Sequence, residues 1–246
     1  MSQISIAFLI TAIAGFSTLI GSFLIFINKK NNSILISSLS FAAGVMICVS
    51  ITDLFKEAII AFHSTFYLIP SILITLITII IGILFSIYFD KKLDFSNNKL
   101  YKAGIFSMLA IIMHNIPEGI ITFLTSTTNI KLGLSLATAI ALHNIPEGIS
   151  ISMPIYYSTK NKKKALIYTF ISGMSEPLGA ILAFIFLKSI INDLTMGVIY
   201  SFTAGIMIAI SIYELIPLSL SYNKKNISII AFILGLIFMY LSHILF

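Results

Sequence analysis

Residues 103–124 read AGIFSMLAIIMHNIPEGIITFL, an apolar run interrupted only by the polar insert at residues 114–119. About 20 consecutive apolar residues are enough to cross the hydrocarbon core of a bilayer as a helix. The whole chain has this character, since 58% of its 246 residues are hydrophobic, 10% are charged and the mean hydropathy is +1.06. A soluble domain needs about 25% charged residues. We therefore expect an all-α integral membrane protein.

Apolar stretches of spanning length occur eight times along the chain. The gaps between them are short, so residues 1–246 are expected to form a single transmembrane domain. The eight predicted membrane helices are Ile4–Asn28, Ser33–Phe62, Phe66–Tyr88, Leu100–Leu124, Leu132–Tyr157, Ala165–Leu187, Leu194–Ser219 and Ile227–Leu245.

The lysines are distributed very unequally between the two ends of these helices, and the chain has no arginine. One end has only Lys56, Lys131 and Lys188. The other end has twelve: Lys29, Lys30, Lys91, Lys92, Lys99, Lys102, Lys160, Lys162, Lys163, Lys164, Lys224 and Lys225. The positive-inside rule places the twelve lysines in the cytoplasm. With an even number of helices, both termini are then extracytoplasmic. We therefore expect a multi-pass protein of the inner or plasma membrane. The net charge of +6 thus reports topology, and no nucleic-acid partner is expected.

The polar insert occurs twice, because the heptapeptide at residues 114–120 is repeated without change at residues 143–149. Histidine and glutamate four positions apart lie on the same face of a helix, with the asparagine beside them. Each proline frees a backbone carbonyl and bends the helix, which membranes tolerate where the helix lines a polar site. Both histidines and Glu176 lie about 12 residues, or roughly 18 Å, from a helix end. Three helices therefore bring polar groups to the middle of the membrane.

Ionisable side chains inside a bilayer are costly and usually serve function. Two imidazoles, two amides and three carboxylates suit a divalent transition metal, whereas an oxygen-only cage would suggest Ca²⁺ or Mg²⁺ and a thiolate cluster Cu(I). The site could hold one or two ions. The predicted metal ligands are His114, Asn115, Glu118, His143, Asn144, Glu147 and Glu176.

These residues resemble the ZIP family of metal-ion transporters, and specifically its small bacterial members. The resemblance covers the whole chain: eight helices, the paired HNIPEG motifs and the segment Ser172–Ala180. It implies inverted three-helix repeats around helices four and five, commonly assembled as a homodimer, with one helix group moving against the other. It also implies a binuclear site in which His114, His143, Glu118 and Glu147 bind one ion. Asn115, Asn144 and Glu176 would bind the second ion, with the same two glutamates bridging.

The function implied is uptake of Zn²⁺ into the cytoplasm as a transported substrate, with Fe²⁺, Mn²⁺, Co²⁺ and Cd²⁺ as alternatives and with no cofactor. The ligand types accept all of these ions, and the sequence leaves open whether the protein is a channel or a carrier. One competing function is an intramembrane metal hydrolase, but the chain has no His-Glu-x-x-His motif and no separate general base. The other is a proton-coupled carrier of an organic solute. We expect a transporter and not an enzyme.

Weaker polar candidates lie nearer the helix ends. Asp53 and Glu57 could attract cations to an entrance or belong to a solvated interfacial face. Glu214 could receive the departing ion or make a polar contact at the helix end. His63 and His243 are expected to be interfacial.

Overall fold

The computed structural model describes residues 2–27, 32–92, 97–186 and 192–245, and these residues are helical apart from short turns. The α-helices are α1 Gln3–Ser22, α2 Asn32–Val49, α3 Phe55–His63, α4 Leu68–Lys92, α5 Lys99–Thr128, α6 Ile130–Thr159, α7 Lys162–Gly173, α8 Ser175–Phe186, α9 Asp193–Ile210, α10 Ile216–Leu220 and α11 Lys225–Leu245. A 3₁₀ turn, Phe23–Phe26, follows α1, and π-helical turns, Ser50–Leu54 and Ser211–Leu215, join α2 to α3 and α9 to α10.

Helices occupy all eight predicted ranges in the described part of the chain, which confirms the all-α membrane architecture. Seven helical stretches are long and apolar enough to cross a membrane. The stretch outside this group is α6, which at 30 residues is as long as α5. Its length is ample for a span.

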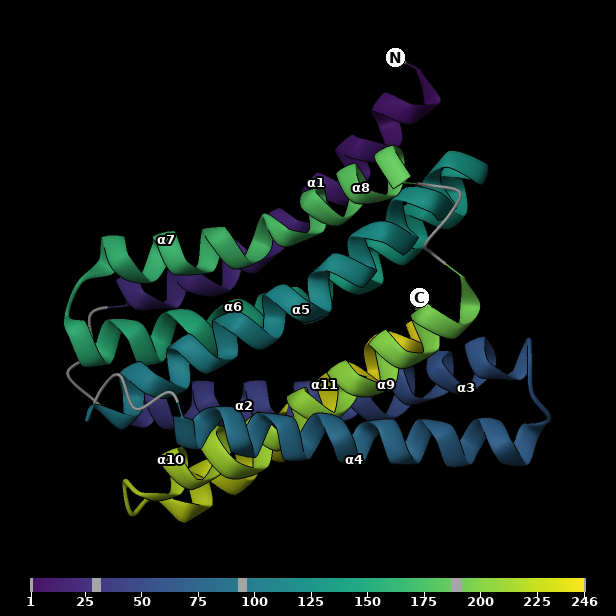
Figure 1. Cartoon of the computed structure of the whole chain (residues 1–246). Coiled ribbons are helices and arrows are strands. Elements are labelled where there is room, and N and C mark those ends of the chain that lie inside the picture. Colours follow the sequence, from purple (N-terminus) through teal and green to yellow (C-terminus); the bar gives the residue numbers. More distant parts are fainter. Residues whose placement is uncertain (1, 28–31, 93–96, 187–191, 246) are drawn as a thin grey trace.

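The helices form two groups that lie against each other (Figure 1). In one group α1, α5, α6, α7 and α8 pack together, and in the other α2, α3, α4, α9 and α11. The groups meet where α6 contacts α2 and α5 contacts α9. In Figure 1 the N-terminus of α1, the α5–α6 turn and the C-terminus of α11 point away from the lysine-rich turns that precede α7 and α11.

Three of the predicted helices are interrupted where the sequence predicted continuous ones. The sixth predicted helix is divided at Met174 into α7 and α8, and Pro177 in the first turn of α8 has no N–H to bond the carbonyl of Gly173. The second and seventh contain the π turns that begin at Ser50 and Ser211. Helices α5 and α6, in contrast, run unbroken through the prolines of their motifs.

Each π turn begins at a buried serine that bonds back to its own helix. The Ser50 hydroxyl donates to the Met46 carbonyl at 2.7 Å, and the Ser211 hydroxyl donates to the Met207 carbonyl at 2.8 Å. Such bonds compete with the backbone ladder and loosen it. A π turn inserts an extra residue, so it changes the direction in which the following side chains point.

Candidate metal centre

The two heptapeptides face each other because α5 and α6 are antiparallel neighbours with only Asn129 between them. The Asn129 side chain caps α6 by accepting from the backbone N–H groups of Lys131 and Leu132 at 3.0 and 3.3 Å. This tight turn fixes the register of the two helices. His114 and His143 consequently lie with ring centroids 5.9 Å apart.

Glu118 lies between the two imidazoles. Its Oε1 is 3.2 Å from His114 Nε2 and 3.0 Å from His143 Nε2. One ligand atom from each of these three residues lies within 4.8 Å of the other two. Imidazole nitrogen with carboxylate oxygen is a donor set that suits Zn²⁺ and related divalent transition metals. The structure thus brings together three of the predicted ligands as a group that could hold one ion.

The remaining predicted ligands surround this group. Glu147 Oε1 lies 3.6 Å from His114 Nε2. The Asn144 amide donates to Glu176 Oε1 and, at 3.0 Å, to the backbone carbonyl of Ala14. Asn115 is completely buried. The helices α1, α5, α6 and α8 therefore converge on one polar centre.

Many polar atoms of this centre have no hydrogen-bond partner among the described residues. These atoms are His143 Nδ1, both amide atoms of Asn115, Asn144 Oδ1, both carboxylate oxygens of Glu147, and Oε2 of Glu118 and of Glu176. A buried polar atom without a partner normally costs about 1–3 kcal/mol. Most of these atoms are oxygens that could bind a cation. Cations entering the centre would satisfy these oxygens, so the oxygen atoms of the centre fit metal ions.

The glycine of each motif allows a neighbouring helix to approach closely. A β-carbon at Gly119 would overlap the carbonyl oxygen of Glu176, and one at Gly148 would overlap the carbonyl oxygen of Thr18. The first contact sets α8 against α5, and the second sets α1 against α6. Without Gly119, α8 could not carry Glu176 so close to the motifs.

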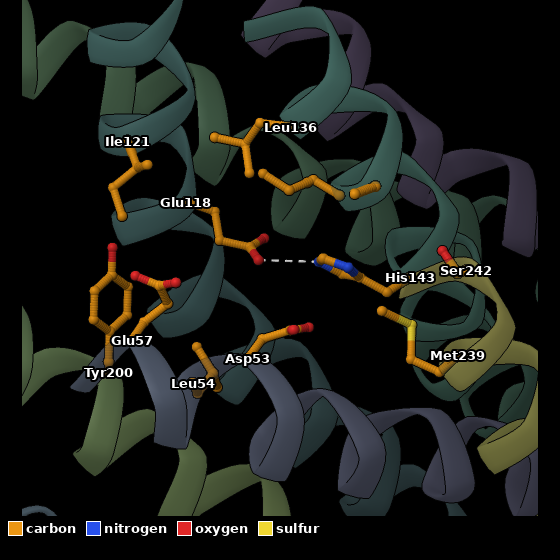
Figure 2. Close-up of a pocket in the computed structure, with 12 residues that line it drawn as sticks. Asp53, Leu54, Glu57, Glu118, Ile121, Leu136, His143, Tyr200, Met239 and Ser242 are labelled. Carbon is orange, nitrogen blue, oxygen red and sulfur yellow. Dashed lines mark hydrogen bonds and ion pairs between the residues drawn. The ribbon is translucent and has the colours of Figure 1, made fainter. Parts of the chain in front are cut away.

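A cavity of about 400 Å³ reaches the centre from one side (Figure 2). Glu118 and His143 form its inner wall, while Asp53, Glu57 and Tyr200 line it nearer the helix ends. Figure 2 shows the carboxylates of Asp53 and Glu57 directed into this cavity together with that of Glu118. Asp53 belongs to the π turn Ser50–Leu54 and Glu57 to α3.

Glu214 lies at the opposite, lysine-rich end, where it lines two cavities of about 250 and 290 Å³ together with Asp90 and Tyr213. Lys102 lines the larger of these cavities and makes a 2.7 Å ion pair with Asp90. The motifs do not contain Asp90 or Lys102, so sequence reasoning missed them.

The two outlying histidines differ in what the structure describes. His63 is exposed, and its Nδ1 lies 3.0 Å from the carbonyl of Phe66; its interfacial position stays a prediction. The side chain of His243 lies outside the described part of the chain.

Comparison with known proteins points to the same family as the motifs. The profile described as ZIP Zinc transporter matches residues 94–243. The chain belongs to the ZIP family. It is similar to a protein named zinc transporter ZupT from Clostridium perfringens, which is 38% identical over 100% of this chain and 98% of the relative. The zinc transporter ZupT of Streptococcus mutans is 39% identical over 98% of this chain and 97% of the relative. The ZupT of Campylobacter jejuni is 39% identical, covering 98% of this chain and 96% of the relative.

Membership of the ZIP family confirms the resemblance seen in the sequence and makes this chain a membrane transporter rather than an enzyme. The hydrolase alternative is therefore set aside. With its apolar helices, this ZIP protein is a multi-pass protein of the plasma membrane. Metal ions are the substrate of the protein and not a resident cofactor.

One signal within this ZIP sequence could have located the acidic residues outside the motifs. Residues 41–54 read FAAGVMICVSITDL and residues 202–215 read FTAGIMIAISIYEL, with eight identical positions. Asp53 and Glu214 occupy the same place in the two copies. The repeat therefore marks Asp53 and Glu214, both already candidates from the sequence, as equivalent positions.

Proposed function

We propose that this ZIP transporter carries Zn²⁺ into the cytoplasm through a binuclear site at the membrane midplane, and that Fe²⁺, Mn²⁺, Co²⁺ and Cd²⁺ can use the same route. The observation that carries the proposal is the buried centre in which Glu118 bridges His114 and His143 at 3.2 and 3.0 Å. The ZupT name of its relatives favours zinc among these ions.

In this proposal the ligands divide between two ions. His114 and His143 bind the first ion, and Glu118 and Glu147 bridge to the second. The second ion is bound by Asn115, Asn144 and Glu176. The hydrogen bond between Asn144 and Glu176 supports this division, because it joins two of these ligands away from the imidazoles. Nitrogen ligands would thus favour transition metals at the first position, while the second position is all oxygen.

The ion would enter through the cavity that contains Asp53 and Glu57. Carboxylates lining a cleft raise the local concentration of cations. Along α5, the residues Ala110 and Ile111 are only 2% and 0% exposed and separate Glu118 from Phe106, which lines a cavity near Glu214. The centre is therefore closed by packed side chains toward the lysine-rich side and open through the cavity toward the lysine-poor side. Transport then requires the opposite state, in which the route toward Glu214 opens.

Inverted repeats would provide two such states. The repeated sequences at 41–54 and 202–215 support this arrangement, and so do matched contacts of their first residues. Phe41 packs on Phe238 with ring centroids 5.5 Å apart, and Phe202 packs on Phe85 at 5.3 Å. The first contact joins α2 to α11, and the second joins α9 to α4. The extracytoplasmic position of both termini and assembly as a homodimer stay predictions.

Uptake of radioactive zinc into proteoliposomes containing the purified chain tests this function. We expect saturable uptake that His114→Ala abolishes. The matched control His63→Ala removes an exposed histidine outside the cavities and should transport like the unmodified protein. Zinc uptake that survives His114→Ala, or uptake of an organic solute in place of zinc, would contradict the proposal.

A further inference from the structure

Thr18 in α1 is a completely buried threonine whose hydroxyl has no hydrogen-bond partner among the described residues. Three other buried threonines, Thr11, Thr75 and Thr169, donate to the carbonyl four residues earlier, at 3.0, 2.8 and 2.9 Å, whereas the hydroxyl of Thr122 shares with Thr18 the lack of a partner among the described residues. At Thr18 the corresponding acceptor, the carbonyl of Ala14, already accepts from Ser17 at 2.6 Å and from Asn144 at 3.0 Å. The Thr18 hydroxyl is thus available for a different partner.

The position of Thr18 matches that of Glu176 in the other half of the molecule. Their carbonyls make equivalent contacts, Thr18 with Gly148 of the second motif and Glu176 with Gly119 of the first. Their side chains also make equivalent contacts. A β-carbon at Gly15 would lie 3.1 Å from Cβ of Glu176, and one at Gly173 would lie 3.4 Å from Cβ of Thr18.

The spacing along the chain agrees with these contacts. Thr18 and Glu176 are 158 positions apart, as are Gly15 and Gly173. Gly21 and Gly179 are a further pair with this spacing and make equivalent contacts. A β-carbon at Gly21 would overlap the carbonyl of Ile145, and one at Gly179 would overlap the carbonyl of Ile116. Ile116 and Ile145 are the same residue of the two motifs. Helix α1 therefore crosses α6 in the way that α8 crosses α5.

This correspondence indicates what Thr18 faces. Glu176 accepts a hydrogen bond from Asn144, the asparagine of the second motif. The equivalent asparagine for Thr18 is Asn115, and neither of its side-chain amide atoms has a hydrogen-bond partner among the described residues. A buried hydroxyl and a buried amide without partners thus occupy matching places on the same polar centre.

We propose that Thr18 is a further ligand residue of the second ion, supplying its hydroxyl oxygen from the side of Asn115, opposite Glu176. The inference rests on the two-ion function proposed above and adds a fourth helix to it. The second ion then has Glu176 from α8 on one side and Thr18 from α1 on the other, with one asparagine from each motif and the bridging glutamates between them.

The neutral hydroxyl also sets the charge of the centre. Glu118, Glu147 and Glu176 together carry one negative charge fewer than two divalent ions carry positive charges. A carboxylate at Thr18, as the correspondence with Glu176 would allow, would complete the balance and hold both ions more tightly. Threonine instead leaves the second ion weakly enough bound to depart, which a transporter needs.

The test is equilibrium titration of the purified full-length protein with Zn²⁺, comparing the unmodified protein with Thr18→Val, Thr18→Ser and Thr18→Glu. Thr18→Val loses one neutral hydrogen-bonding group, so its affinity for the second ion should fall roughly two- to tenfold. Its affinity for the first ion should not change. Thr18→Ser keeps the hydroxyl and should match the unmodified protein. Thr18→Glu should bind the second ion more tightly and slow uptake into proteoliposomes.

Thr11→Val is the matched control, because it removes a buried hydroxyl from the same helix whose partner is the Ala7 carbonyl. The inference is wrong if Thr18→Val binds the second ion with unchanged affinity. It is also wrong if Thr18→Val lowers this affinity no more than Thr11→Val does. If Thr18→Val does not fold, the same conclusion follows from a Thr18→Glu protein whose second ion binds no more tightly. An unmodified protein that binds only one ion would instead overturn the two-ion function itself.

Discussion

Replacing Gly119 by alanine tests whether close approach of α8 to α5 builds the metal centre. A β-carbon there would overlap the Glu176 carbonyl oxygen and lie 2.7 Å from its carbonyl carbon, whereas ordinary van der Waals contact begins at 3.4 Å. Relief of the contact with the carbonyl carbon alone requires movement of the α8 backbone by about 0.7 Å, and the nearer carbonyl oxygen requires more. Because the obstruction is backbone, no side-chain rotation can relieve it.

Gly119→Ala should lower the free energy of unfolding by about 1–3 kcal/mol, the usual effect of overpacking a protein interior. For a protein of this size each kcal/mol lowers the midpoint of thermal unfolding by about 2–4 °C, so Gly119→Ala should unfold roughly 2–12 °C lower. Displacement of Glu176 should also weaken the second zinc ion by about 10–100-fold, the range seen when groups that orient ligands are lost. Thermal unfolding and zinc titration of the purified protein measure both effects.

Gly104→Ala is the control, since it lies on the same helix but its β-carbon would meet the flexible end of Ile155 at 2.8 Å. Gly104→Ala should lower the midpoint of thermal unfolding less than Gly119→Ala does, and it should leave zinc binding unchanged. A Gly119→Ala protein with the thermal stability and zinc affinity of the unmodified protein would refute the packing argument.

Three further predictions concern topology, pH and the entrance. In a background without Cys48, a cysteine at Lys163 should resist impermeant thiol reagents in intact cells while tags at either terminus react, and labelling at Lys163 would overturn the topology. Metal affinity should fall as acidification from about pH 7.5 to pH 5 protonates His114 and His143, whose ordinary pKa is about 6.5, so a pH-independent affinity would exclude them as ligands. Asp53→Asn combined with Glu57→Gln should raise the zinc concentration for half-maximal uptake severalfold and reduce its dependence on ionic strength, and an unchanged uptake curve would exclude them from the entrance.

The helices and the main ligands were predictable because both follow from local chemistry. Membrane helices need about 20 apolar residues, so the length of each run located them. The short connection at Asn129 made antiparallel neighbours of the two motif helices and brought Glu118 to both histidines. These inferences required only spacing along the chain.

Other features depend on contacts between helices distant in sequence. The π turns at Ser50 and Ser211 change the direction of the residues that follow, and a regular period of 3.6 residues does not predict such turns. Thr18 reads in the sequence as one more small residue in an apolar helix. Its role becomes visible only when α1 lies against α6 and its usual acceptor is occupied.

The central claim is that the two motifs and Glu176 form one centre for two ions, and equilibrium metal titration of purified variants tests it most directly. Glu118 lies against both histidines, so Glu118→Ala should bind zinc poorly at both positions. In the proposed two-ion centre Glu176 serves only the second position, so Glu176→Ala should still bind about one ion per chain through His114 and His143. Full two-ion binding by Glu118→Ala would contradict the account.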